Sequence, residues 1–526
     1  MATFLYRLGR ASFHRWPLVI AVWLVTIASV AAVAITMSQP TNDEFTIPGI
    51  PSEEAADLQQ ELFPGAQDAF DQATVNVVVA APEGESLEQE DNTAAVDALI
   101  AELGTIDQVP ADLLANPVQA GPAQTEQIVA QKTEAGMPVE AAEQDAAALS
   151  PLSPDGRVGL ISFAFDVETI TDVEPATQDA VLEALDVARD RGVAAEANGQ
   201  GMSSLEPPGA TAELIGIGVA LVVLVLTFGS LVAAGLPILS AMVGVGLGIT
   251  GITAATAFTD GIGSITPTLA SMIGLAVGID YALFILARYR SELQRTHNRA
   301  EAVGLAVGTA GSAVVFAGLT VIIALTALTV VGIPFLSAMG LAAAATVFIA
   351  VLVALTLLPA VLGMVKSKAF GGVVRQYQPK RDADGVVLNN GVRWARLIGR
   401  RPIIAALVVV VGLGALAIPL KDLYLAFPTD STASTDTSAR QASDLISEAF
   451  GPGREAPMLA VVDARETPEA DRGEAFGEIV AWASDQDGVD NAQIASTNEA
   501  GTGAQVLITP VAGPDDPATQ DLLTEL

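Results

Sequence analysis

Seven apolar stretches constrain this chain more than any other feature. An α-helix needs about 20 predominantly apolar residues to cross the hydrocarbon core of a bilayer, so each stretch predicts a membrane-spanning helix. The first stretch follows a basic segment, but it is longer than the apolar part of a signal peptide, and we interpret it as an uncleaved span. The seven predicted spans cover residues 17–37, 210–228, 231–258, 267–287, 309–331, 335–362 and 402–420.

Charged residues are separated from the apolar stretches. The chain is 51% hydrophobic, yet it carries a formal net charge of -35. Residues 38–209 contain 33 Asp and Glu but only 4 Lys and Arg, whereas residues 229–287 contain two acidic residues. This separation indicates acidic, water-exposed domains between membrane spans, and their charge excludes a nucleic-acid surface.

The composition favours no cofactor, metal site or nucleotide site. The chain has no cysteine, which excludes a disulfide framework and thiolate ligands. Its two histidines, His14 and His297, lie beside basic residues near predicted span ends, and an isolated histidine does not make a metal site. The sequence has no phosphate-binding loop of the G-x-x-x-x-G-K type, which argues against coupling to ATP hydrolysis.

Basic residues predict the orientation in the membrane. Arginines precede the first span and follow the fourth, and residues 366–401 carry nine Lys and Arg. Alternating spans bring these segments to one side, which the positive-inside rule assigns to the cytoplasm. We therefore expect a multi-pass protein of the cytoplasmic (plasma) membrane with a cytoplasmic N-terminus. The predicted organisation is a cytoplasmic N-terminus and first span (1–37), an extracytoplasmic domain (38–209), a bundle of five spans (210–365), a cytoplasmic linker (366–401), a seventh span (402–420) and a second extracytoplasmic domain (421–526).

The first extracytoplasmic domain has a mixed pattern. Residues 73–82 and 157–167 are rich in β-branched residues and predict strands, while helical patterns lie between and after them. Two adjacent ferredoxin-like units of strands and helices would suit this order. The predicted fold class is therefore a polytopic α-helical membrane protein with α+β domains outside the membrane.

An internal repeat relates the two halves of the chain. The string HRWPLVIA at residue 14 is similar to GRRPIIAA at 399, EEAADLQQELFPG at 53 to RQASDLISEAFGPG at 440, and PATQDAVLEAL at 175 to PATQDLLTEL at 517. The seventh span thus repeats the first and is followed by a second outer domain. We expect the chain to be the N-terminal portion of a longer plan, in which spans two to six are also repeated.

The fourth span contains the main candidate site. Asp280 lies eight positions before Arg288, or about 12 Å along a helix, and an aspartate at such depth costs about 3 kcal/mol. The adjacent Tyr281 offers a phenol that donates a hydrogen bond. Gly274 and Gly278 have the G-x-x-x-G spacing that lets helices approach closely, which would bring a second polar group toward Asp280. A structural hydrogen bond for Asp280, a packing or interfacial role for Tyr281, and helix packing alone for the glycines remain the alternatives.

The string GLAVGIDYALFILARYRSEL at 274–293, the long domain after the first span, the five clustered spans and the repeat together resemble the MmpL branch of the resistance-nodulation-division (RND) transporters. The resemblance implies ferredoxin-like porter domains and an RND-type repeat whose second copy is truncated. It also implies that Asp280 and Tyr281 belong to a proton relay, facing an equivalent pair on a tenth span, with Gly278 and Phe284 in the same motif. Spans two to six resemble a sterol-sensing-domain arrangement. Ser312 stands where relatives often carry an arginine.

The leading hypothesis is a secondary exporter driven by the proton-motive force, which moves lipids or other amphiphilic molecules and uses H⁺ as its coupling ion. Its partners are membrane lipids and the substrate, and cell-envelope accessory proteins or a homo-oligomer remain open. The alternatives are a lipid-sensing scaffold without transport and a protein-export accessory of the same superfamily. An intramembrane aspartyl protease is disfavoured because it needs two carboxylates that share a water, and only Asp280 lies deep, so we expect no enzyme activity.

Overall fold

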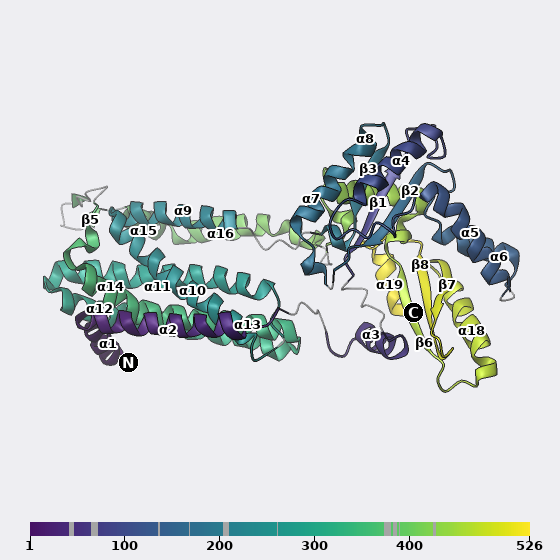
Figure 1. Ribbon diagram of the computed structural model, residues 1–526. Coiled ribbons are helices and arrows are strands. Elements are labelled where there is room, and N and C mark those ends of the chain that lie inside the picture. Colours follow the sequence, from purple (N-terminus) through teal and green to yellow (C-terminus); the bar gives the residue numbers. More distant parts are fainter. Residues whose placement is uncertain are drawn as a thin grey trace. The chain divides into compact units, whose positions relative to one another are not determined.

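Figure 1 shows a computed structural model of the chain, and it describes all residues except 42–46, 65–71, 135–136, 168, 204–209, 260, 373–379, 382–386, 389 and 424–427. Parts of the predicted linker 366–401 therefore lie outside the described residues. The chain divides into two units. The helical unit comprises Met1–Pro48 and Glu206–Leu423, and the mixed unit comprises Gly49–Leu205 and Tyr424–Leu526.

The helical unit consists mainly of long apolar helices. Among the described residues, six helices are long and apolar enough to cross a membrane, and the apolar helix over Glu213–Phe228 is shorter. These helices confirm the predicted polytopic α-helical class. The helices of this unit are α1 (Ala2–His14), α2 (Trp16–Met37), α9 (Ala210–Phe228), α10 (Leu231–Ala255), α11 (Ile265–Thr296), α12 (Arg299–Thr326), α13 (Pro334–Leu352), α14 (Leu358–Val365), α15 (Asn390–Arg400) and α16 (Pro402–Leu416).

Helix α11 extends well past the apolar stretch that predicts it, which ends at residue 287. The added turns carry a salt bridge between Arg288 and Glu292, four residues apart, at 2.8 Å, and pairs at this spacing stabilise a helix. The helix ends where His297 adopts a left-handed conformation with φ 52° and donates its N–H to the Leu293 carbonyl. The candidate site thus lies in the middle of a long continuous helix.

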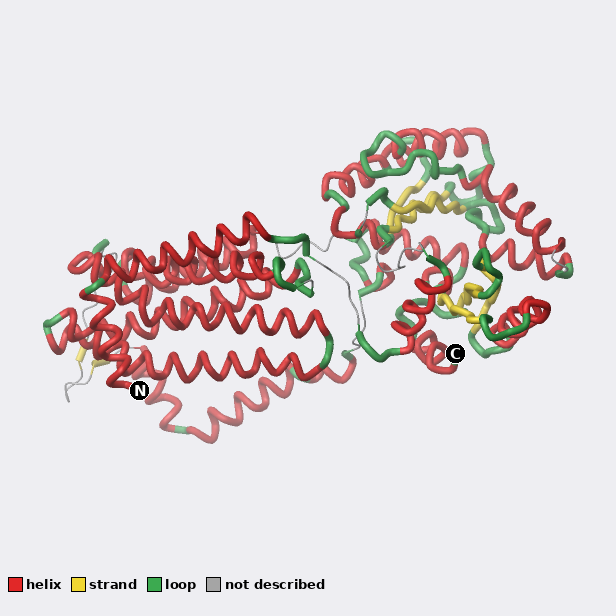
Figure 2. Tube along the Cα trace, turned by 60° about the horizontal axis from the view of Figure 1, so that its bottom comes forward, coloured by secondary structure: helices red, strands yellow, loops and turns green. Residues whose placement is uncertain are grey.

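In the described residues, the mixed unit contains two three-stranded antiparallel sheets, whose strands Figure 2 shows in yellow. The first sheet has the order β2-β1-β3, from β1 (Thr74–Ala80), β2 (Val158–Ala164) and β3 (Ala194–Asn198). Val77 of the central strand pairs with Ile161 on one side and Ala197 on the other. Helices α7 (Pro175–Ala184) and α8 (Asp186–Arg189) join β2 to β3 around β1, which makes a split β-α-β unit of the ferredoxin-like type.

The second sheet also contains a split β-α-β unit, but its central strand comes last in the chain and not first. Its order is β6-β8-β7, from β6 (Met458–Asp463), β7 (Val489–Thr497) and β8 (Gly503–Pro510). Helix α18 (Arg472–Ser484) joins β6 to β7, which lie on either side of β8. Two small antiparallel sheets with covering helices confirm the predicted α+β class of the domains between the spans.

The two repeats exchange a helix. Helix α17 (Ser438–Phe450) comes from the second repeat, but Ala442 and Ile446 pack on Val78 and Leu160 of the first sheet. Its repeat counterpart α3 (Pro51–Leu62) packs on the second sheet, where the Asn498 side chain donates to the Leu62 carbonyl at 3.0 Å. The helices α4 (Glu90–Leu103) and α17 therefore cover opposite faces of β1, which explains why this strand is apolar on both faces.

A polar contact fastens the exchanged helix to the first sheet. Glu455, just after α17, accepts hydrogen bonds from Asn198 Nδ2 at 2.6 Å and Ser443 Oγ at 2.5 Å. Burial raises the pKa of Glu455, the two hydrogen bonds lower it, and the nearby carboxylates of Asp430 and Asp444 raise it further. Burial also raises the pKa of Asp430, which accepts from the Gly199 N–H.

Replacing Glu455 with Gln should weaken the pH dependence of this contact. Because the pKa of Glu455 is raised in the folded protein, its stabilising contribution is complete below the unfolded value of about 4.3 and is lost as pH rises through the folded value. The glutamine is uncharged at every pH. The measurement is hydrogen exchange of the backbone amides of α17, corrected for the intrinsic exchange rate at each pH. We expect the corrected rate to change less between about pH 5 and about pH 8 in Glu455→Gln than in the wild type.

Glu448→Gln on the same helix provides the matched control, because the Glu448 side chain is 72% exposed. It should retain the wild-type dependence on pH. If Glu455→Gln retained the wild-type dependence as well, the carboxylate of Glu455 would not be the group that couples this contact to pH.

Candidate functional site

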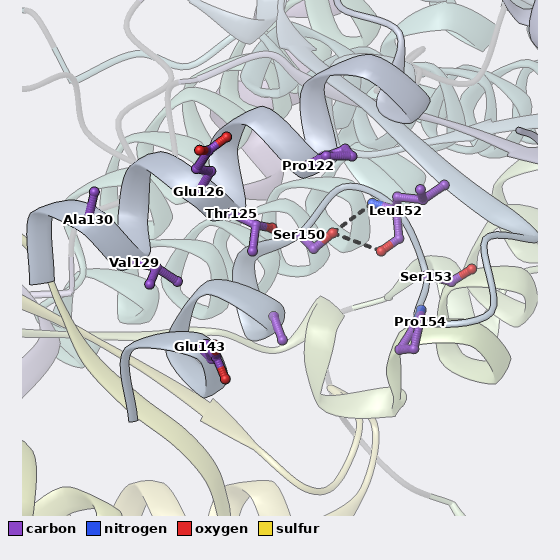
Figure 3. A pocket seen from close by; sticks show the side chains of 12 residues that line it. Pro122, Thr125, Glu126, Val129, Ala130, Glu143, Ser150, Leu152, Ser153 and Pro154 are labelled. Atoms are coloured by element: carbon purple, nitrogen blue, oxygen red, sulfur yellow. Dashed lines mark hydrogen bonds between the residues drawn. The ribbon is translucent and has the colours of Figure 1, made fainter. Parts of the chain in front are cut away.

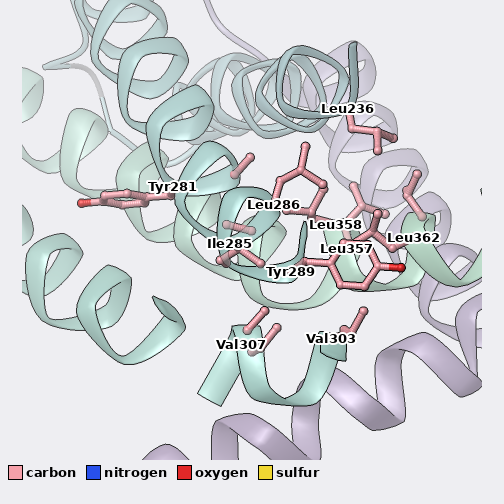
Figure 4. Packing of buried hydrophobic residues seen from close by; sticks show 14 of the residues in the cluster. Leu236, Tyr281, Ile285, Leu286, Tyr289, Val303, Val307, Leu357, Leu358 and Leu362 are labelled. Atoms are coloured by element: carbon pink, nitrogen blue, oxygen red, sulfur yellow. The ribbon is translucent and has the colours of Figure 1, made fainter. Parts of the chain in front are cut away.

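Tyr281 is a buried member of the helical unit. It is 7% exposed and lies among the apolar side chains that α10 to α14 contribute. Figure 4 shows it with Ile285 and Tyr289, which follow at four-residue steps on α11. A Cβ placed on Gly318 of α12 would lie 3.7 Å from the Tyr281 hydroxyl oxygen, so the absence of a side chain at Gly318 leaves the space beside the phenol. The sequence analysis did not single out Gly318.

Asp280 points out of the same helix. It is exposed, and it lies on a stripe of α11 with the exposed residues Met272, Ala276 and Phe284, which recur at four-residue steps. Among the described residues, no side chain or backbone group forms a hydrogen bond or ion pair with its carboxylate. Asp280 is thus the charged group on an otherwise apolar stripe of a membrane-spanning helix.

The glycines of the motif lie on the other side of α11. A Cβ on Gly278 would lie 3.0 Å from Ala241 Cβ of α10, and a Cβ on Gly274 would lie 2.6 Å from Thr346 Cγ2 of α13. Gly248 of α10 also faces Thr346, at 2.7 Å from the same methyl group. The glycines therefore permit close contacts among α10, α11 and α13. Successive helical residues are about 100° apart, so these contacts lie away from Asp280 and bring it no polar partner.

The hydroxyl groups of α12 bond within their own helix. Ser312 Oγ donates to the Thr309 carbonyl at 2.7 Å, and Thr320 Oγ1 donates to the Phe316 carbonyl at 2.9 Å. Ser312 therefore does not replace the charge partner that an arginine would provide for Asp280. Arg288 bonds to Thr309 Oγ1 at 3.2 Å as well as to Glu292, and it is engaged near the end of α11.

A second carboxylate reaches α11 from α9. Ser271 Oγ donates to Glu213 Oε1 at 2.9 Å, and Ser271 is 6% exposed. Ser271 precedes Asp280 by nine residues, or about 14 Å along the helix. The sequence analysis missed this pair, although an acidic residue inside the predicted second span was a usable signal.

The mixed unit contains a cavity of about 710 Å³ in the helical hairpin of α5 (Pro117–Glu134) and α6 (Val139–Leu149). Figure 3 shows Val129, Leu152 and Pro154 on its wall and Glu126 and Glu143 beside them. Its volume is in the range of small-molecule sites, and its lining is mainly apolar. In the described part of the chain, no group of three or more His, Cys, Asp or Glu is placed to hold a metal ion.

The apolar helices of the helical unit define a multi-pass membrane protein, which also contains the two small sheets of the mixed unit. The model of the MMPL family matches residues 44–416, and the chain belongs to this family. This finding confirms the resemblance inferred from the sequence.

Individual relatives agree with this assignment. The chain is 33% identical over 526 residues to the membrane protein YdfJ of Bacillus subtilis (strain 168), covering 100% of this chain and 67% of YdfJ. It is 29% identical over 253 residues to MmpL11 of Mycolicibacterium smegmatis, named as a mycolic acid-containing lipids exporter, covering 48% of this chain and 26% of that protein. The hedgehog release protein Disp from the water bear Hypsibius dujardini has a similar fold, with TM-score 0.52 and 13% identity over 99% of this chain and 76% of Disp.

Replacing Gly278 with Val should loosen the contact between α10 and α11. The added side chain would meet Ala241, and overpacking of this kind costs about 1–3 kcal/mol. We expect a lower midpoint of thermal unfolding for the protein purified in detergent. The matched control is Gly246→Val on α10, where no atom lies within 4 Å of the added Cβ. Equal midpoints for the two variants would show that the close approach at Gly278 does not contribute to stability.

Proposed function

We propose that the protein is a proton-motive-force-driven exporter of lipids or other amphiphilic molecules across the cytoplasmic membrane. In this proposal Asp280 takes up and releases the coupling proton, and Tyr281 is its neighbour in the relay. The observation that carries the proposal is the Asp280 carboxylate on the apolar stripe of α11, without a partner among the described residues. No catalytic role and no cofactor are proposed.

The physical argument concerns the charge of Asp280. An ionised aspartate facing hydrocarbon costs about 3 kcal/mol, and protonation removes the charge that causes this cost. After proton uptake the stripe of α11 can pack on an apolar surface, whereas with an ionised Asp280 it favours a polar one. A helix packed on this stripe would therefore shift its position when Asp280 changes its charge. We propose that the opposing surface is the second copy of the bundle that the internal repeat predicts, with an equivalent Asp–Tyr pair. At such a boundary, protonation of Asp280 would be coupled to a movement of one copy of the bundle relative to the other.

Tyr281 fits a supporting role in this relay. It is next to Asp280 in sequence, but its ring is buried and faces Gly318, so the phenol is held by packing. A fixed phenol can donate to a carboxylate or to a water that reaches it. Gly274 and Gly278 support the relay indirectly, because they set α11 against α10 and α13.

The orientation and the substrate class are also proposals. The arginines before α2 and after α11 support a cytoplasmic N-terminus and a mixed unit outside the cytoplasm, by the positive-inside rule. The name of MmpL11 supports a lipid substrate, and the apolar-lined cavity in the mixed unit is large enough for part of an amphiphile. The chain spans about two thirds of YdfJ and about a quarter of MmpL11, so the activity is proposed for the whole protein.

Replacing Asp280 with Asn should abolish proton-driven transport. Asparagine keeps the size of the side chain but cannot alternate between a neutral and an ionised state. We expect inside-out membrane vesicles containing Asp280→Asn to accumulate a fluorescent phospholipid no faster under an imposed proton gradient than without it. Tyr281→Phe, which keeps the buried ring and removes the hydroxyl group, should retain part of the gradient-driven rate.

Glu301→Gln is the control for a lost carboxylate. Glu301 lies near the start of α12 and accepts a hydrogen bond from the Tyr6 hydroxyl at 3.0 Å. The proposed relay lies on another helix, at the middle of α11. The Glu301→Gln variant should transport at the wild-type rate when the vesicles contain equal amounts of variant and wild-type protein. Gradient-driven transport by Asp280→Asn would contradict the relay. Binding of lipid without transport by the wild type would instead favour the lipid-sensing alternative.

A further inference from the structure

Helix α15 has two chemically distinct sides. Arg393, Arg396 and Arg400 recur at steps of three and four residues, which places them on one side of the helix. Trp394 and Ile398 recur at a step of four on another side, with Leu397 between the two sets. Trp394 is 64% exposed and Leu397 is 60% exposed. Large apolar side chains beside an arginine row are typical of helices that lie in a membrane interface.

Helix α15 is the repeat counterpart of α1, but it does not have the residues for the same packing. The repeat aligns Pro402 with Pro17, and therefore Trp394 with Gly9 and Leu397 with Ser12. In α1 the two small residues are buried, and a Cβ on Gly9 would lie 2.7 Å from Val307 Cβ of α12. A tryptophan at this position has no room in a contact of that kind. The apolar side of α15 therefore does not fit a contact like that of α1, and it is exposed.

A bilayer surface is within reach of α15 and complements its charge. Arg401 joins α15 directly to α16, whose apolar segment Pro402–Lys421 is long enough to cross a membrane. The helix consequently lies where the chain enters the bilayer. Tryptophan favours the boundary between hydrocarbon and headgroups, and arginine beside the membrane is attracted to anionic lipids.

We propose that α15 is an interfacial helix that binds anionic phospholipid headgroups through Arg393, Arg400 and Arg401, with Trp394, Leu397 and Ile398 immersed below them. The site is separate from Asp280 and does not depend on transport. It anchors the start of the seventh span to the membrane surface and makes its position sensitive to lipid charge.

The test uses the absence of cysteine in the chain. Ile398→Cys provides a single site for a spin label, and the labelled full chain is placed in nanodiscs of phosphatidylcholine alone or mixed with phosphatidylglycerol. Accessibility to oxygen relative to a nickel complex measures the depth of the label. We expect this ratio to rise by about twofold or more when phosphatidylglycerol is present, and high salt should reverse the rise.

Neutralising the three proposed headgroup ligands, Arg393, Arg400 and Arg401, should remove the effect of the anionic lipid. A triple variant combines Arg393→Gln, Arg400→Gln and Arg401→Gln. Its oxygen-to-nickel accessibility ratio in nanodiscs with phosphatidylglycerol should fall to the value in phosphatidylcholine alone. The matched control removes the same number of charges from α1 and the residue after it, by Arg7→Gln, Arg10→Gln and Arg15→Gln, and should leave the depth of the label unchanged.

Three results would overturn the proposal. A label exposed to water in both lipid mixtures would exclude an interfacial helix. A label shielded from both oxygen and the nickel complex would show that α15 packs on protein. An equal depth in both lipid mixtures would exclude recognition of anionic headgroups.

Discussion

Close contact between helices through small side chains is the constraint on which the helical unit depends. Lipid tails are as apolar as leucine, so association inside a membrane gains little from the hydrophobic effect and relies on packing. Gly278 lies against Ala241, and Gly274 and Gly248 lie on either side of Thr346. These contacts orient α11 about its own axis. They bury Tyr281 and leave Asp280 on the exposed stripe of α11. The exposure of the carboxylate in the candidate site therefore depends on the packing of glycine, alanine and threonine residues on neighbouring faces.

The same comparison of repeats explains the mixed unit and the membrane boundary. The sequence repeats α3 as α17 and α1 as α15. The first pair packs reciprocally, each helix on the sheet of the other repeat, whereas α1 and α15 differ in their contacts. α17 covers the first sheet and α3 the second, and Asn198, Ser443 and Glu455 join the two repeats of the mixed unit. α1 enters a close contact on α12 through Gly9, whereas Trp394 prevents this for α15. The change from glycine in α1 to tryptophan in α15 thus separates the packing of two repeated helices.

Several elements could be predicted from the sequence because each depends on local composition. The spans follow from apolar runs of sufficient length, the strands β1 and β2 from β-branched runs, and family membership from the motif around Asp280 and Tyr281. The strand β3 was not anticipated, because its sequence AAEAN has low strand propensity and pairs only because β1 offers an open edge. The extension of α11 past residue 287 depends on the pair Arg288–Glu292, which apolar periodicity does not report.

The sequence by itself determined the number and order of the apolar helices, the segregation of acidic domains and the position of Asp280 within its span, because these depend on residues that are adjacent in the chain. Only the tertiary structure decided which side of α11 is buried, since that requires the volumes of Ala241, Thr346 and Gly318 on other helices. It likewise decided that Ser312 bonds to its own helix and that Ser271 meets Glu213. Contacts between distant residues depend on how whole elements pack, and no local pattern contains that information.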